Sequence, residues 1–184
     1  MFEVLFFIWI EFVKAFWILF PAYAANMYPP LAHGTHPIDS GKTLWDGKRI
    51  FGDGKTWEGL GLGVGMGGLV GSAEFVLWPS LNSYAKSLGG SLPQYTLPLI
   101  LLVPFGALIG DMCGSFIKRR LGMDRGADIP FLDQLNFILG ALVFSFLFTE
   151  INWGMVIVML VITPILHRAV NLIGFKLKEK AVPW

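Results

Sequence analysis

Polar and charged side chains that could act in catalysis gather near the end of the apolar segment 96–117. Four of them would share one face of a helix, at offsets of four, seven and eight residues from the first: Asp111, Ser115, Lys118 and Arg119. A carboxylate within a membrane-spanning helix is energetically expensive and usually marks a functional site. We therefore expect catalytic groups on this face. The alternative is an ion pair of Asp111 with Lys118 or Arg119 that only stabilises the helix.

A second carboxylate, Asp133, lies near the start of the next apolar segment, across a short polar loop from Asp111. Two carboxylates that meet there could share Mg²⁺, a hard cation that takes oxygen ligands and substrate phosphates. We expect a metal site at Asp111 and Asp133, with Lys118 and Arg119 as further catalytic residues. An acidic residue is also favoured near a helix N-terminus by the helix dipole, so a structural role for Asp133 stays open.

The polar segment 29–56 is too long to be only a connection, and loops of this length are usually functional or disordered. Its glycines would let backbone N–H groups approach phosphates, and its lysines would add positive charge. With flanking residues it supplies most of the candidate substrate-binding residues, which are Asn26, Asp39, Arg49, Gly52, Asp53, Gly54, Lys55, Thr56, Glu58 and Ser115. For Thr56 and Glu58 the alternative is a structural role, as N-cap and first-turn residue of the following helix.

Other chemistries find little support in the sequence. Gly54-Lys55-Thr56 is similar to the end of a phosphate-binding P-loop, but Arg49 stands where that motif requires glycine. The histidines His33 and His36 have no third ligand nearby, so a zinc site is not expected, and no role is assigned to them or to His167 and Arg168. The single cysteine excludes an intrachain disulfide.

The elements that would position these residues are membrane spans. The chain has 184 residues, of which 54% are hydrophobic, and its mean hydropathy is +0.62. Because a spanning helix needs roughly 20 apolar residues, we expect an all-α integral membrane protein with one polytopic domain, residues 1–184. The five expected spans are about 2–28 (broken at Pro21), 57–78, 96–117, 129–148 and 153–175, and the polar loops are about 29–56 and 118–128.

The distribution of cations predicts how the chain is oriented. Twelve of the fourteen Lys and Arg residues fall into three segments: Lys42, Lys48, Arg49 and Lys55; Lys118, Arg119, Arg120 and Arg125; Arg168, Lys176, Lys178 and Lys180. By the positive-inside rule these segments face the cytoplasm. We therefore expect a multi-pass cell-membrane protein with its N-terminus outside, its C-terminus inside and its active site on the cytoplasmic side. Membrane lipids surround it, nucleic acid is not an expected partner, and the sequence leaves the oligomeric state open.

Part of this pattern resembles a known signature. Gly110-Asp111, the run from Ser115 to Arg119, Pro130 and Asp133 are similar to the signature of the phosphatidate cytidylyltransferases, membrane enzymes that make CDP-diacylglycerol. The chain departs from that signature in three places. Asp124-Arg125 replaces a Lys-Asp pair, the His-Gly-Gly stretch before the last Asp is missing, and Gln134 replaces an Arg.

A narrower family fits the departures. Over about residues 22–145 the chain resembles the archaeal CDP-archaeol synthases, through Asn26, Pro37-Ile38-Asp39, Asp46-Gly47, Arg49, the run from Phe51 to Trp57, the run from Ser115 to Arg120, and Leu132-Asp133-Gln134-Leu135. The resemblance implies an enzyme that joins CTP to 2,3-bis-O-geranylgeranylglyceryl phosphate, with Mg²⁺, giving CDP-archaeol and pyrophosphate. It also implies that Asp111 and Asp133 bind the metal and that the loop run binds the nucleotide.

Two other functions stay open at this point, and a third lacks its motif. A small multi-span transporter or channel for an anionic solute would be expected to carry charges at the membrane midplane and often internal repeats. A phosphatidate cytidylyltransferase acting on ester lipids would use the same site. A CDP-alcohol phosphotransferase has a spaced run of aspartates beginning Asp-Gly; Asp46-Gly47 starts like it, but the later aspartates are absent.

Overall fold

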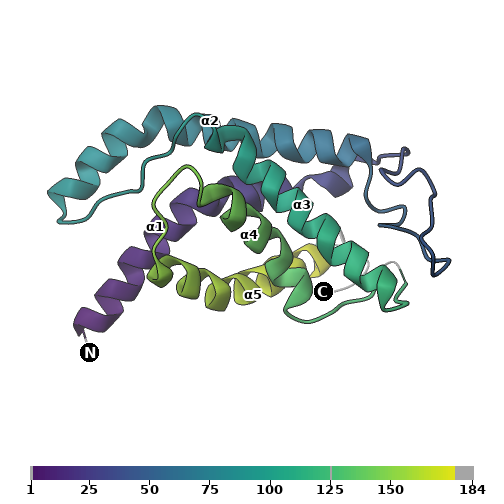
Figure 1. Cartoon of the computed structure of the whole chain (residues 1–184). Coiled ribbons are helices and arrows are strands. Elements are labelled where there is room, and N and C mark those ends of the chain that lie inside the picture. Colours follow the sequence, from purple (N-terminus) through teal and green to yellow (C-terminus); the bar gives the residue numbers. More distant parts are fainter. Residues whose placement is uncertain (1, 125, 177–184) are drawn as a thin grey trace.

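The computed structural model describes residues 2–124 and 126–176, and this part of the chain is helical apart from its loops. It contains α1 (Phe2–Met27), the short 3₁₀ helix η1 (Pro29–Ala32), α2 (Trp57–Ser87), α3 (Leu99–Arg120), α4 (Leu132–Ser145) and α5 (Trp153–Lys176). Figure 1 shows α2 along one side of the molecule, with α1 and α3 crossing beside it and α4 and α5 on the far side of α3. The all-α class predicted from the sequence is confirmed.

Four of the five helices are long and apolar enough to cross a membrane, namely α1, α2, α3 and α5. The expected fourth span, 129–148, is only the 14-residue helix α4. At 1.5 Å per residue α4 is about 21 Å long, which is short of a hydrocarbon core of roughly 30 Å. The chain still reverses there, because Lys118 of α3 contacts Asp133 at one end of α4 and Thr96 donates to the carbonyl of Phe148 at the other.

Two predicted boundaries were wrong. The first helix is not broken at Pro21 but runs through it, and α2 passes Pro79 and ends at Ser87 rather than near residue 78. Pro21 is fully buried, and a Cβ on Gly67 of α2 would lie 2.7 Å from its carbonyl oxygen. Close packing of the neighbouring helix therefore holds α1 continuous, in spite of the hydrogen bond that a proline cannot donate.

Glycines four residues apart bring α2 against its neighbours. A Cβ on Gly63 would lie 2.7 Å from the carbonyl oxygen of Ala25 in α1, and one on Gly67 would lie 2.4 Å from Cβ of Pro104 in α3. A similar contact joins α3 to α4, where a Cβ on Gly110 would lie 2.1 Å from the carbonyl oxygen of Asn136. Small residues at this spacing allow helices to approach closely in lipid.

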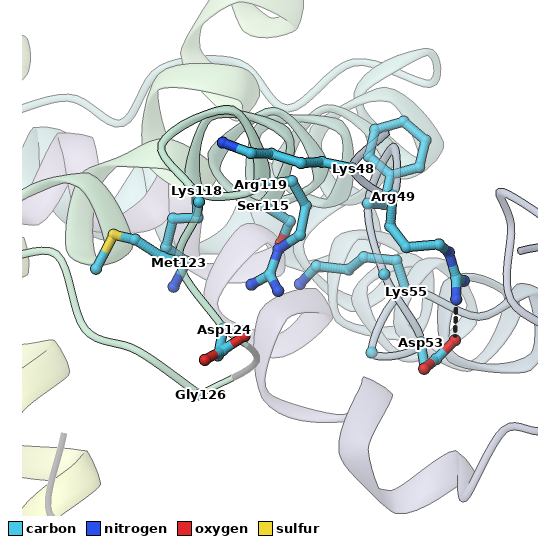
Figure 2. A pocket seen from close by; sticks show the side chains of 14 residues that line it. Lys48, Arg49, Asp53, Lys55, Ser115, Lys118, Arg119, Met123, Asp124 and Gly126 are labelled. Carbon is cyan, nitrogen blue, oxygen red and sulfur yellow. Dashed lines mark ion pairs between the residues drawn. The ribbon is translucent and has the colours of Figure 1, made fainter. Parts of the chain in front are cut away.

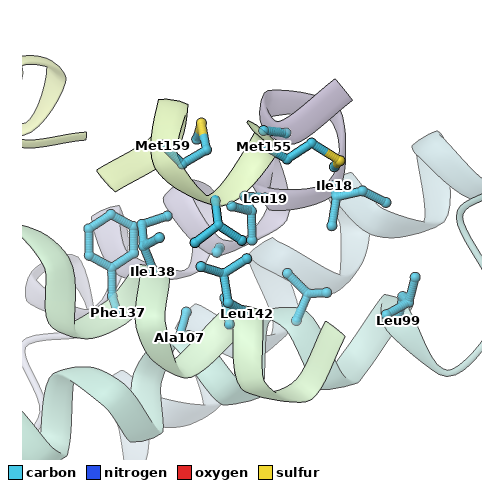
Figure 3. Close-up of a cluster of buried hydrophobic side chains, with 14 of the residues drawn as sticks. Ile18, Leu19, Leu99, Ala107, Phe137, Ile138, Leu142, Met155 and Met159 are labelled. Carbon is cyan, nitrogen blue, oxygen red and sulfur yellow. The ribbon is translucent and has the colours of Figure 1, made fainter. Parts of the chain in front are cut away.

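The apolar core lies between α1, α3, α4 and α5. Figure 3 shows buried side chains from all four helices: Ile18, Leu19, Leu99, Ala107, Phe137, Ile138, Leu142, Met155 and Met159. Beside it, the hydroxyl groups of Tyr23 and Thr163 lie 2.7 Å apart, and the ring of Tyr23 meets Phe137 edge-on. This core fixes α3 and α4 relative to α1, and so sets the position of the polar residues at their ends.

Candidate functional site

A cavity of about 540 Å³ opens where the segment 37–56 meets the C-terminal end of α3 and the loop after it. Figure 2 shows the cationic ends of Lys55, Lys118 and Arg119 directed into the same space. The residues that line it are Lys48, Arg49, Phe51, Gly52, Asp53, Gly54, Lys55, Ser115, Lys118, Arg119, Gly122, Met123, Asp124 and Gly126. Five of them are cations and two are carboxylates, so the cavity is suited to an anionic ligand.

Asp39 organises the loop that forms one wall of this cavity. Its side chain is fully buried and accepts hydrogen bonds from the guanidinium of Arg49 and from the backbone N–H groups of Gly41, Phe51 and Gly52. Gly52 has a φ of +90°, a conformation that glycine adopts without steric cost. Burial would raise the pKa of Asp39, but these four donors outweigh it and hold that pKa well below its usual range. The carboxylate therefore stays charged and acts as the centre of the loop.

Arg49 joins this centre to the cavity. Its guanidinium also pairs with Asp53 at 2.7 Å, an ion pair drawn in Figure 2, and both residues line the cavity. The hydrogen bonds to Asp39 and Asp53 raise the pKa of Arg49 above its usual value. One guanidinium thus connects the buried carboxylate with an exposed one at the cavity wall, and its position is set from both sides.

A second set of contacts fastens the loop to α3. Arg120 donates to the backbone carbonyls of Lys48 (3.1 Å) and Arg49 and pairs with Asp46 at 2.8 Å. In return the ammonium of Lys48 donates to the backbone carbonyl of Arg120 at 3.0 Å. The guanidinium of Arg120 also lies over the ring of Phe116, 5.1 Å from its centroid. Arg120 does not line the cavity, so it positions residues that do.

The two predicted metal carboxylates each hold a lysine. Asp111 accepts a hydrogen bond from Lys55, and Asp133 binds Lys118 through both oxygens, at 2.7 and 2.8 Å. Asp133 also accepts from the backbone N–H of Ile129 at 3.0 Å, so it has a structural role at the start of α4 as well. The sequence left open an ion pair of Asp111 with Lys118 or Arg119. In the structure the partner of Asp111 is instead Lys55, which comes from the distant loop.

Arg119 lines the cavity and, among the described residues, has a side-chain donor without a hydrogen-bond partner. Within the part of the chain that the structure describes, its Nε is buried and has no hydrogen-bond partner. A buried donor without a partner is costly unless a ligand or water completes it. Figure 2 shows its guanidinium extending into the cavity near Lys55. Arg119 is therefore placed to donate to a bound anion.

Eight of the fourteen candidate residues line the cavity: Arg49, Gly52, Asp53, Gly54, Lys55, Ser115, Lys118 and Arg119. Asp111 and Asp133 lie behind it, paired with its lysines. The other four lie elsewhere. Asp39 is the buried centre of the loop. Thr56 is the N-cap of α2 and accepts from Gly59 N–H at 3.1 Å. Glu58 binds His36, and Asn26 is half-buried in the last turn of α1.

Several residues of the cavity were not among the sequence candidates, namely Lys48, Phe51, Gly122, Met123, Asp124 and Gly126. For Lys48 a signal existed, because it belongs to the same cluster of cations as Arg49 and Lys55. The residues after α3 carry no such signal. They reach the cavity because Gly122, at a φ of +76°, turns the chain back toward Lys48. Arg125, counted among the cations of this loop, lies outside the described residues.

Asp111 and Asp133 suit a magnesium ion by their chemistry. Both offer carboxylate oxygens and remain partly exposed, with 25% and 19% of their side chains accessible. Within the described residues no group of three or more His, Cys, Asp or Glu side chains could hold a metal ion. Magnesium is usually held by one or two carboxylates together with substrate phosphates, so this donor set fits if a ligand supplies the remaining oxygens.

The chain matches known proteins over most of its length. The family model "CarS-like: CDP-archaeol synthase" matches residues 6–184. The chain is 43% identical to the CDP-archaeol synthase of Thermococcus onnurineus, over 92% of this chain and 95% of that protein. It is 41% identical to the one of Methanococcoides burtonii, over 90% of this chain and 100% of that protein. A solved structure described as "Structural insight into an intramembrane enzyme for archaeal membrane lipids biosynthesis" superimposes with a TM-score of 0.74 at 36% identity, covering 88% of this chain and 94% of that one.

An all-helical membrane fold with a cationic cavity at the ends of its helices defines a multi-pass intramembrane enzyme that acts on anionic substrates. The extent of the match goes further than this class. The chain belongs to the CDP-archaeol synthase family. The predictions of the family and of a cytidylyltransferase activity are therefore confirmed, and a transporter does not fit this family.

Proposed function

We propose that the cavity binds the triphosphate of CTP and that the enzyme transfers the cytidylyl group to 2,3-bis-O-geranylgeranylglyceryl phosphate. The products are CDP-archaeol and pyrophosphate, made for ether phospholipids. The observation that carries this proposal is the set of five cations around a 540 Å³ cavity, backed by two carboxylate–lysine pairs, in a chain of this family. A cavity of this volume is in the range of small-ligand sites.

The chemistry explains why cations rather than a general base surround the cavity. An oxygen of the lipid phosphate forms a bond to the α-phosphorus of CTP, and the bond from that phosphorus to the pyrophosphate oxygen breaks. The lipid phosphate is already ionised at neutral pH, so no side chain has to remove a proton. The barrier lies in bringing two anions together in line, which requires positioning and neutralisation of charge. Lys55, Lys118 and Arg119 can supply both.

The two carboxylates determine where the lysines stand. Asp111 directs Lys55 from the loop toward α3, and Asp133 directs Lys118 from α3 toward α4. Asp111 and Asp133 are also the proposed metal ligands. When bound there, Mg²⁺ would neutralise phosphate charge and polarise phosphate oxygens.

We place the cavity on the cytoplasmic side. Twelve of the fourteen cations of the chain lie in the loop before α2, in the last turn of α3 and the loop after it, and in the C-terminal part of the chain from Arg168 onward. Of these, Arg125, Lys178 and Lys180 lie outside the described residues. The contacts between Lys48 and Arg120 hold the first two of these segments at the same end of the helices. The positive-inside rule then orients that end toward the cytoplasm, where CTP is available.

A nucleotidyl-transfer assay on detergent-purified protein tests the proposal. Labelled CTP, Mg²⁺ and the geranylgeranyl ether phosphate should give CDP-archaeol with the wild type, and Asp111→Asn and Asp133→Asn should each reduce kcat at least 100-fold. Asp128→Asn is the matched control, because Asp128 is a nearby carboxylate that pairs with Arg168 and does not line the cavity. Phosphatidic acid as the lipid separates an ether-lipid enzyme from one acting on ester lipids.

Two results would contradict the proposal in different ways. Absence of product with either lipid from folded wild-type protein would remove the assigned reaction. Full activity in both Asn variants would keep the reaction and discard the proposed metal ligands. Unfolding is excluded by requiring each variant to elute from size exclusion, and to melt, as the wild type does.

A further inference from the structure

A second large cavity lies at the opposite end of the helices. It has a volume of about 480 Å³ and is lined by Lys14 of α1, Met155 of α5 and parts of the connecting segments 91–96 and 148–152. The catalytic cavity lies at the C-terminal end of α3, and this one lies at its N-terminal end. For a helix of 22 residues that separation is about 33 Å. We refer to the second space as the distal cavity; the cytidylyl transfer described above does not use it.

The walls of the distal cavity are held together by hydrogen bonds. Thr96 donates to the backbone carbonyl of Phe148 at 3.3 Å, and Thr149 donates to the backbone carbonyl of Gln94 at 3.1 Å. These two contacts join the segment before α3 to the segment before α5. The side chain of Asn152 accepts from the backbone N–H of Met155 at 2.9 Å and starts α5. Hydrogen bonds between the segments 91–96 and 148–152 therefore hold the walls of the cavity in place.

A buried ion pair lies beside this cavity. Glu11 has only 4% of its side chain exposed, and it accepts from Lys14 at 3.0 Å. Its second oxygen is buried and has no hydrogen-bond partner within the described residues. A Cβ on Gly154 would lie 3.3 Å from that oxygen, so the carboxylate reaches the start of α5. An ammonium group has three N–H donors. Within the described part of the chain one donor of Lys14 goes to Glu11, which leaves two for a ligand in the cavity.

An apolar groove continues from the distal cavity along α1. It has a volume of about 180 Å³ and shares Lys14, Ser91 and Leu92 with the cavity. Phe6 and Trp9 line it from α1, and Ala85 lines it from the end of α2. A polar cavity that opens into an apolar groove at a lysine matches the shape of an amphiphile, with its headgroup in the one and a chain in the other.

The charged residues of the distal cavity determine which kind of lipid headgroup it can bind. Among its lining residues it presents one cation, Lys14, and one carboxylate, Glu150, the latter exposed. A headgroup with only a negative charge would meet Glu150 and, behind Lys14, Glu11. A headgroup with both a phosphate and an ammonium group finds an opposite charge for each. We propose that the distal cavity and its groove bind a bilayer phospholipid with such a zwitterionic headgroup, its phosphate at Lys14, its ammonium at Glu150 and one chain between α1 and α2.

Native mass spectrometry of delipidated, detergent-purified protein tests this proposal, with phosphatidylethanolamine, phosphatidylglycerol and diacylglycerol as probes. The wild type should bind phosphatidylethanolamine at least tenfold more tightly than the other two. Lys14→Gln and Glu150→Gln should each weaken that binding about tenfold, and Ala85→Phe should do so by filling the groove. Lys86→Gln is the matched control, because Lys86 is an exposed lysine near the same end of α2 that lines neither the cavity nor the groove.

The following results would overturn the proposal. Equal binding of the three lipids, or a preference for phosphatidylglycerol, would remove the zwitterionic site. Binding that survives in Lys14→Gln, Glu150→Gln and Ala85→Phe but is lost in Arg119→Gln would place the lipid in the catalytic cavity. If Lys14→Gln fails to fold because Glu11 loses its partner, Glu150→Gln and Ala85→Phe still decide, since Glu150 is exposed and Ala85 is on the rim of the groove.

Discussion

Lys48 and Arg120 bind each other's backbone. The ammonium of Lys48 donates to the carbonyl of Arg120 at 3.0 Å, and the guanidinium of Arg120 donates to the carbonyl of Lys48 at 3.1 Å. The two residues are 72 positions apart in the chain. This reciprocal contact fastens the polar loop before α2 to the end of α3, and so brings the cations of the loop to the same cavity as Lys118 and Arg119.

Replacing Arg120 should loosen this loop. Hydrogen bonds to charged groups contribute about 1.5–3 kcal/mol each, and Arg120→Ala removes those to the carbonyls of Lys48 and Arg49 and to Asp46. We expect KM for CTP to rise roughly 10- to 100-fold, with a smaller change in kcat, because the loop must then be ordered by the nucleotide. Steady-state kinetics measure both constants. Arg168→Ala, which breaks the pair with Asp128 away from the cavity, should leave KM unchanged; a fall in kcat alone with Arg120→Ala would mean that the residue acts on the reaction itself.

Lys55 and Asp111 should act as a unit. A hydrogen bond joins them across 56 positions of the chain. Residues in one ion pair show coupling energies of about 0.5–3 kcal/mol in double-mutant cycles. We therefore expect the effects of Lys55→Gln and Asp111→Asn on kcat/KM to be clearly less than additive in the double variant. The four enzymes are compared under identical lipid and Mg²⁺ concentrations. Strict additivity would show that the pair is not kept during the reaction.

Asp39→Asn should destabilise the loop, although Asp39 itself does not line the cavity. Removing one partner of a buried ion pair costs about 3–5 kcal/mol. Asparagine also keeps only one of the two acceptor oxygens, so it cannot accept from Arg49, Gly41, Phe51 and Gly52 as Asp39 does. Hydrogen exchange of these amides and the melting temperature report the change. The rate of exchange should rise most in the segment 37–56. Unchanged protection of Phe51 and Gly52 would contradict the role given to Asp39.

The same contact predicts a dependence on pH. The folded-state pKa of Asp39 lies below its usual value of about 3.9. Its contribution to stability is therefore complete above that unfolded value and is lost as the pH falls below it toward the folded-state pKa. The difference in melting temperature between the wild type and Asp39→Asn should be constant above about pH 5 and shrink below about pH 4. A difference that instead grows on acidification would reverse the sign assigned here.

Gly110 should not tolerate a larger residue. A Cβ at this position would lie 2.1 Å from the carbonyl oxygen of Asn136, which is backbone and cannot turn away. We expect Gly110→Ala to push α4 from α3 and to lower stability by about 1–3 kcal/mol, with activity reduced because Asp133 moves relative to Lys118. Gly61→Ala is the control: nothing lies within 4 Å of a Cβ there, and alanine favours the helix. Equal melting temperatures of the two variants would argue against close α3–α4 contact.

The sequence by itself determined the class of the protein and much of its site. The runs of apolar residues predicted helical spans, because a helix must be about 20 apolar residues long to cross a bilayer. The offsets from Asp111 to Lys118 and Arg119 placed these residues on one helix face, since the period of a helix is local and fixed. The family signature followed from residues that are close together in the chain.

Only the tertiary structure decided which charges meet. Spacing could pair Asp111 with Lys118, but the fold turns Lys55 toward Asp111 and gives Lys118 to Asp133. It also makes Asp39 the buried centre of a loop, since four donors from separate positions converge on it. The continuity of α1 through Pro21 likewise depends on packing between helices. Contacts between residues far apart in the chain depend on how helices approach one another, and no local period in the sequence records that.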